Sequence, residues 1–109
     1  MGITRTDLFT PQQNALATLA KVLGHPARIA ILQHLMKTHG CICGDLVEEI
    51  GLAQATISQH LRELKNIGII KGEIDGTSIC YCIDGNRWSD IKNMLNSFFD
   101  LKSCTDKCC

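Results

Sequence analysis

The sequence predicts a mostly helical α+β fold, and three observations support this class. Apolar residues recur at helical spacing through most of the chain up to residue 66. From Ile69 to Ile83 the pattern changes to the alternation typical of β-strands. A last amphipathic stretch then returns to the helical period. We therefore expect four helices, two strands and a final helix in one domain over residues 1–109, with a short cysteine-bearing tail at residues 102–109.

Two helices are expected in the first third of the chain. Thr10-Pro11-Gln12-Gln13 supplies an N-cap, a proline at the first helical position and a glutamine at N3, which together form a capping box. The apolar face that follows, up to Gly24, consists of Leu16, Leu19, Ala20 and Leu23. A second helix begins at His25-Pro26, runs for about twelve residues and ends at Thr38-His39-Gly40.

The next two helices are short and are joined by a turn. After Gly44-Asp45, residues 46–50 are expected to form a helix of about two turns, which Gly51-Leu52 ends. From Gln54 a further helix runs to residues 66–68, and its buried face consists of Ile57, Leu61 and Leu64. Two short helices joined by a glycine-containing turn form a helix-turn-helix.

The strands, residues 69–74 and 77–83, are expected to pair around a type I′ turn at Asp75-Gly76. On the second strand, Cys80 and Cys82 share the face opposite to Ile79, Tyr81 and Ile83. A final helix after residues 84–86 carries an apolar stripe of Ile91, Met94, Leu95, Phe98 and Phe99. A helix-turn-helix followed by a hairpin is a winged helix, in which the second helix of the motif enters the DNA major groove.

Positive charge is concentrated rather than abundant. Eleven Lys and Arg residues balance eleven Asp and Glu residues, so the net charge indicates no nucleic-acid partner. Residues 54–72, however, contain three cations and only one anion, Glu63. Amide and guanidinium groups on the outer face of the second motif helix suit base edges, and hydroxyls and lysines suit phosphates. The candidate DNA-binding residues are Gln54, Thr56, Ser58, Gln59, Arg62, Lys65 and Lys71.

Two other interpretations stay open in this region. Exposed Gln, Ser and Arg are also ordinary residues of a solvated helix in a small domain. His60 lies beside the buried stripe, and we expect it to be a packed, hydrogen-bonded residue rather than a DNA contact.

Two stretches of the chain carry the pattern of a known family. Residues 23–32 follow L-x-H-P-x-R-x-x-I-L, and residues 58–68 follow S-x-H-L-x-x-L-x-x-x-G. Over about residues 12–100 the sequence resembles the ArsR/SmtB family of metal-responsive bacterial repressors. The resemblance implies a homodimeric winged-helix repressor that holds an operator until an inducer binds. Ala53 is a departure, because the family often has a serine cap there, worth about 1 kcal/mol.

The resemblance also implies that the first and last helices pack across a two-fold axis. The residues expected in this dimer interface are Leu16, Leu19, Met94, Leu95, Phe98 and Phe99. The last helix supports this expectation, since its apolar stripe is richer than three short helices can cover. The alternative is that these residues fold onto the core of a single chain.

Seven cysteines form three groups, Cys41-x-Cys43, Cys80-x-Cys82 and Cys104-x₃-Cys108-Cys109. The chain shows neither a secretory signal nor an apolar run of about 20 residues, so we expect a soluble cytoplasmic protein without a membrane partner. An odd number of cysteines in that compartment favours metal or thiol chemistry over a disulfide framework. Thiolates suit soft ions, and three of them suit trivalent arsenic or antimony, whereas zinc takes four ligands.

The tail group of Cys104, Cys108 and Cys109 is the first choice for the inducer site. If the last helix continues to Lys107, Cys104 and Cys108 lie on one face, one turn apart. The alternative is a cysteine-bearing tail without a binding role.

Cys41 and Cys43 are the second choice for the inducer site. They resemble the C-V-C-D-L-C motif of arsenic-sensing family members, but Leu46 stands where the third cysteine would be. Cys80 and Cys82 could approach them as a four-sulfur site, because the segment before the third helix of a winged helix pairs with the hairpin. Otherwise Cys80 and Cys82 are structural.

These observations predict a transcriptional repressor of a metal or metalloid resistance operon. Trivalent arsenic or antimony would release it from double-stranded operator DNA, and no organic cofactor or small organic substrate is expected. An alternative keeps the repressor but makes the inducer Cd, Zn, Pb, a thiol oxidant or a persulfide. A small thiol redox enzyme is disfavoured, since the sequence has no Cys-x-x-Cys.

Overall fold

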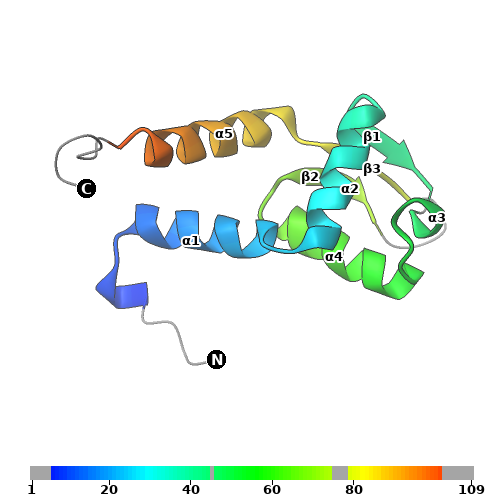
Figure 1. Ribbon diagram of the computed structural model, residues 1–109, viewed down its shortest axis with the longest axis horizontal. Helices are drawn as coiled ribbons and strands as arrows, with labels where there is room; N and C mark the ends of the chain where they lie inside the picture. The colour runs from blue at the N-terminus through cyan, green and yellow to red at the C-terminus, as the bar shows by residue number, and fades with distance from the viewer. Residues whose placement is uncertain (1–5, 45, 75–78, 102–109) are drawn as a thin grey trace, which may run out of the picture.

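A computed structural model of the protein describes residues 6–44, 46–74 and 79–101. It confirms the predicted class, a mostly helical chain with a small antiparallel sheet. The elements, labelled in Figure 1, are η1 Thr6–Leu8, α1 Pro11–Leu23, α2 Pro26–Lys37, β1 Cys41–Cys43, α3 Val47–Ile50, α4 Gln54–Asn66, β2 Ile70–Glu73, β3 Cys80–Ile83 and α5 Gly85–Phe99.

Side chains cap three of the helices at their N-termini. The predicted capping box is present at α1, where Gln13 N donates to Thr10 Oγ1 and Thr10 N donates to Gln13 Oε1. His25 Nδ1 accepts from Ala27 N at the start of α2, and Asp84 Oδ1 accepts two backbone N–H groups at the start of α5. These local signals explain why the beginnings of the three helices lie close to the predicted positions.

Helix α3 is shorter than predicted. It comprises only Val47–Ile50, about one turn rather than two, and no side chain caps its start at Leu46. Gly51 adopts a left-handed conformation with φ 83° and ends the helix. The helix-turn-helix therefore consists of a single helical turn followed by the longer α4.

The sheet has three strands in the order β1-β3-β2, all antiparallel, so the third strand adds to the two predicted ones. Residues 41–43 pair with the hairpin, as the winged-helix pattern implies. The hairpin turn at Asp75-Gly76 lies outside the described residues. Gly72 has φ 115°, and a Cβ there would collide with the backbone carbonyl of Cys80, so β2 and β3 require glycine at this position.

The core lies between α2, α4 and the inner face of the sheet. Its least exposed members are Ile31, Leu35, Ile57, Leu61, Leu64, Ile69 and Tyr81. As predicted, Ile79, Tyr81 and Ile83 face this core, while the two cysteines of β3 point to the other side of the sheet. Leu19 of α1 and Ile91 of α5 join the same cluster and attach the two outer helices to it.

Helices α1 and α5 project in the same direction from this core, as Figure 1 shows, and give the molecule extents of 55 × 32 × 25 Å. Among the described residues, no single helix is long and apolar enough to cross a membrane. The consecutive helices α1 and α2 pass that test together by length and composition only, across a bend of 85°.

Candidate nucleic-acid interface and thiol site

The outer face of α4 exposes Thr56, Gln59, Arg62 and Lys65, four of the predicted DNA-binding residues. Ser58 is a correction, because only 8 % of its surface is exposed and it lies at the edge of the stripe that contains Ile57 and Leu61. Gln54 is half-buried, and its Nε2 donates to Ser58 Oγ at 3.2 Å. These two residues therefore pack the first turn of the helix instead of facing outward.

Gln59 and Arg62 form a pair on the exposed face. Arg62 Nη1 donates to Gln59 Oε1 at 3.0 Å, across one turn of the helix. The bond uses the amide oxygen of Gln59 as its acceptor and places the amide beside the guanidinium on the exposed face. An amide and a guanidinium held side by side are the groups that make bidentate contacts with purine edges.

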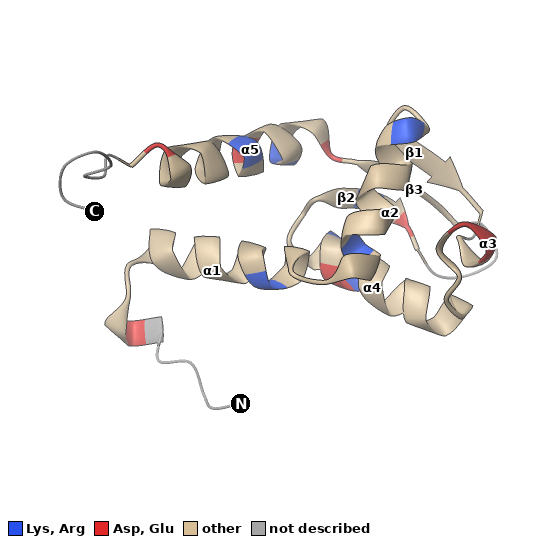
Figure 2. Ribbon diagram, in the orientation of Figure 1, with Lys and Arg blue, Asp and Glu red and all other residues tan. Residues whose placement is uncertain are grey.

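The C-terminal end of α4 is connected to β2. Lys65 Nζ donates to the backbone carbonyl of Gly72 at 2.7 Å, and the neighbouring Lys71 is exposed on the strand. In Figure 2 the ribbon of α3, where Glu48 and Glu49 lie, is coloured for acidic residues, and the positions of basic residues are spread over several other elements. The hydrogen bond from Lys65 to Gly72 thus joins α4 to β2, the strand that carries Lys71.

His60 joins α4 to the beginning of α2. Arg28 Nε donates to His60 Nδ1 at 3.1 Å, Arg28 Nη1 donates to the Val22 carbonyl at 3.1 Å, and the His25 and His60 rings are 4.3 Å apart. Burial lowers the pKa of His60, His25 and Arg28 lower it further, and Glu63 acts in the opposite direction. A neutral ring with its proton on Nε2 fits the bond from Arg28. The predicted packed, hydrogen-bonded role of His60 is confirmed.

The predicted dimer residues divide into three kinds. Phe98 and Phe99 are exposed on the projecting end of α5 and contact each other edge to face. Leu16, Met94 and Leu95 are half-buried against the core. Leu19 is a correction, since it is only 2 % exposed within its own chain and has no apolar area left for an interface. An apolar groove of about 540 Å³ separates α2 from α5, lined by residues that include Ile29, Met36, Trp88 and Leu95.

The structure brings four cysteines together across β1 and β3. Disulfides join Cys41 to Cys82 and Cys43 to Cys80, with Cα atoms 4.0 and 4.1 Å apart. The expectation of free thiols at Cys41 and Cys43 is therefore corrected, because the strand register places each of them directly opposite a cysteine. The predicted approach of Cys80 and Cys82 to this pair is confirmed. The two Cys-x-Cys spacings were the signal for it, since cysteines two apart share one face of a strand.

The tail trio of Cys104, Cys108 and Cys109 lies outside the described residues. Helix α5 ends at Phe99, where Asp100 N closes the last turn on the Asn96 carbonyl. The condition under which Cys104 and Cys108 would share one face of this helix, its continuation to Lys107, is therefore not met by α5, which ends before the tail. Within the part of the chain that the structure describes, no group of three or more His, Cys, Asp or Glu side chains is arranged to hold a metal ion.

Comparisons with known proteins agree with this architecture. Residues 25–71 match the model of the arsR family of bacterial regulatory proteins. The chain is 30 % identical over 97 residues to the biofilm growth-associated repressor of Xylella fastidiosa, covering 89 % of this chain and 83 % of that one.

Two further relatives are similar over shorter stretches. The transcriptional regulator YgaV of Escherichia coli is 36 % identical over 80 residues, 72 % of this chain and 81 % of its own. The repressor SmtB of Mycobacterium tuberculosis is 35 % identical over 68 residues, 62 % of this chain and 50 % of its own. No solved structure matches at a significant level. From the matched helix-turn-helix and the extent of these similarities, the chain belongs to the arsR family of bacterial regulatory proteins.

Proposed function

We propose that this protein is a homodimeric repressor of a metal or metalloid resistance operon, released from operator DNA when trivalent arsenic or antimony binds its cysteine thiolates. The observation that carries the DNA-binding part is the ordered Gln59–Arg62 pair on the exposed face of α4. It lies beside a wing that is joined to the same helix through Lys65 and Gly72.

The contacts divide into base contacts and backbone contacts. Arg62 and Gln59 suit the edges of guanine and adenine in the major groove, and Thr56 suits either a base or a phosphate. Lys65 and Lys71 lie at the wing end of the helix, where the DNA backbone passes in a winged helix. Base contacts set the sequence preference of the protein, whereas phosphate contacts set its salt dependence.

Variants of Arg62 and Lys71 test the DNA-binding part. Arg62→Ala is expected to weaken binding to a duplex selected from a random pool by about 10- to 100-fold, because a bidentate base contact is lost. Lys71→Ala is expected to weaken binding to all sequences alike and to reduce the salt dependence by about one counterion. Lys37→Ala, an exposed lysine at the end of α2, is the control in fluorescence anisotropy titrations. Equal affinity of the Arg62 variant and the wild type would contradict the proposed contact.

Dimerisation is supported by the projecting ends of α1 and α5. Phe98, Phe99, Leu8 and Phe9 each expose half or more of their surface there, which is costly for a monomer in water. Two copies related by a two-fold axis would cover these side chains and place two copies of α4 on successive half-sites of an operator.

The tail cysteines remain the first choice for the inducer. Three sulfurs suit a trivalent metalloid with a lone pair, and Cys104, Cys108 and Cys109 lie within a stretch of six residues. Cys41 and Cys43, the second choice, require prior reduction of the two disulfides. Zinc is a weaker candidate, since α5 and its C-cap offer only Asp90 and Asp100. Release requires the inducer to bind the DNA-free form more tightly than the DNA-bound form.

Arsenic K-edge absorption on fully reduced protein tests the inducer site. Wild type is expected to give three As–S bonds, which the Cys104→Ser, Cys108→Ser, Cys109→Ser variant loses. A matched Cys41→Ser, Cys43→Ser variant is expected to retain them. The opposite pattern would move the inducer to the second choice. Operator affinity that does not change with arsenite would refute induction by this ion.

A further inference from the structure

The four cysteines of β1 and β3 form a two-by-two array on the outer face of the sheet. Gly44 N donates to the Ile79 carbonyl and Ile83 N donates to the Gly40 carbonyl, so these flanking pairs are the hydrogen-bonded ones. The alternation of an antiparallel ladder then makes both cysteine pairs non-hydrogen-bonded, the type in which opposite side chains are closest. Both pairs are therefore placed for S–S bond formation by the register of the ladder.

The array is accessible to small molecules from solvent. Cys41, Cys43 and Cys80 are exposed and Cys82 is half-buried, while Tyr81 and Ile42 between them face the core. Buried structural cysteines are inert, whereas reactive cysteines are at least partly exposed. Exposed, paired thiols can be oxidised and reduced without unfolding the chain.

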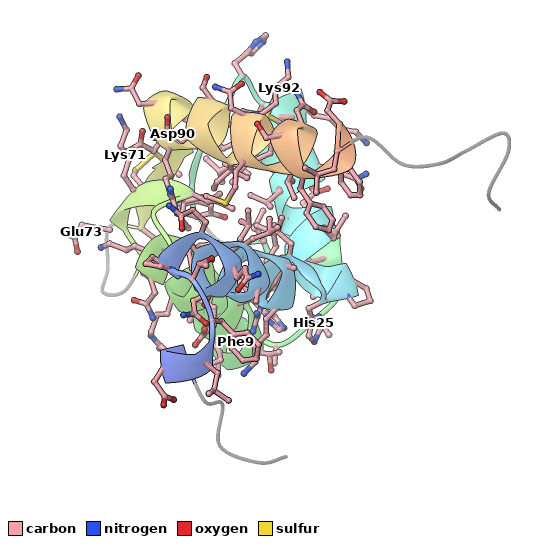
Figure 3. All side chains as sticks on the ribbon, turned by 90° about the vertical axis from the view of Figure 1, so that its left-hand side faces the viewer. Phe9, His25, Lys71, Glu73, Asp90 and Lys92 are labelled. Atoms are coloured by element: carbon pink, nitrogen blue, oxygen red, sulfur yellow. A yellow bond between two sulfur atoms is a disulfide. The ribbon has the colours of Figure 1, made fainter. Side chains whose placement is uncertain are left out.

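The array also joins the two parts of the protein that would contact DNA. β1 leads into α3, the first helix of the helix-turn-helix, and β3 is a strand of the wing. Across β3 each cysteine faces a charged residue of β2, with Lys71 opposite Cys82 and Glu73 opposite Cys80. Figure 3 labels these two charged residues along one edge of the molecule. Cys41 and Cys82 thus lie in one row across the sheet with Lys71, a candidate phosphate contact.

We propose that Cys41, Cys43, Cys80 and Cys82 are a reversible thiol oxidation site whose oxidant is a peroxide, and that the oxidised form fixes the wing against the helix-turn-helix. The structure corresponds to the oxidised form. In the reduced form, the backbone hydrogen bonds of the three-residue β1 and the packing of Ile42 on the core hold the wing to the segment before α3, without the two cross-strand S–S bonds.

The reaction at each pair consumes one hydrogen peroxide. A thiolate attacks one peroxide oxygen and the O–O bond breaks, which leaves a sulfenic acid. The departing hydroxide takes up the proton that the thiol gave off when it ionised and becomes water. The partner thiol attacks that sulfur, an S–S bond forms, the S–O bond breaks and a second water leaves. A small dithiol reverses the reaction by thiol–disulfide exchange, supplying two electrons and two protons while it becomes a disulfide itself.

The two pairs differ in their charged neighbours. A lysine ammonium beside a cysteine favours the thiolate, which is the form that attacks peroxide, and a carboxylate disfavours it. Because Lys71 faces Cys82 and Glu73 faces Cys80, the Cys41–Cys82 pair is assigned as the faster one to be oxidised. Cys82 is its attacking residue and Cys41 its resolving residue.

The experiment uses the full chain with Cys104, Cys108 and Cys109 replaced by Ser, so that only the four sheet cysteines react. Reduced protein is treated with two equivalents of hydrogen peroxide and mapped by mass spectrometry of non-reduced peptides. Affinity for a duplex selected from a random pool is then measured for the oxidised and the dithiothreitol-reduced forms. Two matched variants retain a single pair each, Cys43→Ser, Cys80→Ser and Cys41→Ser, Cys82→Ser.

The expected result is a mass loss of about 4 Da, with Cys41 linked to Cys82 and Cys43 to Cys80, reversed fully by dithiothreitol. The variant that retains Cys41 and Cys82 is expected to react several-fold faster than the other. Oxidation is expected to raise DNA affinity by about three- to tenfold, because a preordered wing loses less freedom on binding.

Two results would overturn the proposal. One is oxidation to sulfinic acid or to intermolecular links without the two internal disulfides. The other is measurable DNA binding that has the same affinity in the oxidised and the reduced form. The coupling to DNA rests on the proposed operator binding, whereas disulfide formation does not. Disulfides that form and reverse in a protein that binds DNA in neither form would therefore refute the repressor function and support the oxidation site.

Discussion

The N-cap residue of helix α4 is Ala53, whose side chain cannot accept a hydrogen bond from the free N–H groups of the first turn. The backbone there is already extended, with φ −62° and ψ 150°, which is the conformation of an N-cap residue. The absence of the cap is thus a matter of side-chain chemistry alone. It leaves the first turn to be held by packing, in part through the contact of Gln54 with Ser58.

Replacement of Ala53 by Ser is expected to stabilise the protein by about 1 kcal/mol, because the hydroxyl would accept from the N2 or N3 backbone N–H. Urea denaturation of wild type and variant measures the difference in free energy of unfolding. Ala55→Ser is the control, since Ala55 is exposed within the helix and cannot act as a cap. A gain equal to that of the control would contradict the interpretation.

His60 makes stability depend on pH. Its pKa in the folded protein is lowered below the usual 6.5, mainly by burial, so the unfolded chain binds a proton more readily. The stabilisation is therefore complete above about pH 6.5 and is lost as the pH falls below that value. Protonation would also remove the acceptor that Arg28 uses, since Nδ1 would then carry hydrogen.

Denaturation of wild type and His60→Gln between about pH 8 and pH 5 measures this dependence. The wild type is expected to lose stability more steeply below about pH 6.5, because the other histidines are common to both proteins. Parallel curves for the two proteins would exclude His60 as the source.

At the scale of secondary structure, local signals were sufficient to predict where a helix begins, because a helix start depends on a few neighbouring residues. Thr10 was predicted as an N-cap and His25-Pro26 as a helix start, and both side chains accept a backbone N–H in the structure. Asp84 was predicted only as part of the break before the last helix, but it is the N-cap of that helix. The predicted stop of α3 at Gly51 is present, and the helix is shorter than predicted because it begins only at Val47, without a side-chain cap at Leu46. Helix α5 ends at Phe99, where the sequence carries neither glycine nor proline to mark a stop.

Features that depend on contacts between residues distant in sequence were harder to predict from the sequence. The register of β1 on β3 decides that Cys41 meets Cys82 and Cys43 meets Cys80, and no periodicity within either segment specifies it. The burial of Ser58 is similar, because a helical wheel gives its angle but not the contact with Gln54 that covers it. The exposure of Thr56, Gln59, Arg62 and Lys65, by contrast, was predictable from the helical period of residues 54–66.

The disulfides are expected to raise the free energy of unfolding mainly by lowering the conformational entropy of the unfolded chain. Cys41 and Cys82 are 41 residues apart, and joining them removes conformational entropy worth about 4 kcal/mol at 25 °C on the chain-entropy model. The second disulfide adds less, because the first has already brought its cysteines near each other. Guanidinium denaturation of the oxidised and dithiothreitol-reduced protein should therefore differ by several kcal/mol.

The single-pair variants supply the control for this prediction. The variant that retains only Cys41–Cys82 is expected to keep most of the difference between the oxidised and reduced forms. A difference that vanished in this variant would mean that the stabilisation does not arise from chain closure.

At the scale of the whole molecule, the projecting ends of α1 and α5 are the surfaces through which we expect two copies to associate. The double variant Phe98→Ser, Phe99→Ser is expected to raise the dissociation constant of the dimer by at least tenfold. The reason is that two exposed aromatic side chains would no longer be buried on association, and each such burial contributes about 1.5–3 kcal/mol. Sedimentation equilibrium measures the change. Met36→Ser, which removes an exposed apolar side chain at the far end of α2, is the control. Unchanged association in the phenylalanine variant would place the interface elsewhere.

Because the Cys41–Cys82 disulfide connects two distant points of the backbone, the oxidised protein is topologically a covalent ring with two linear arms. All seven candidate DNA-binding residues, from Gln54 to Lys71, lie inside the ring. All six candidate dimer residues lie on the arms, Leu16 and Leu19 before it and Met94 to Phe99 after it. A protease cut within the ring would leave the oxidised chain in one piece, whereas a cut in either arm would release a fragment. Oxidation therefore divides the molecule into a closed part that holds the candidate DNA-binding residues and two open arms that hold the candidate dimer residues.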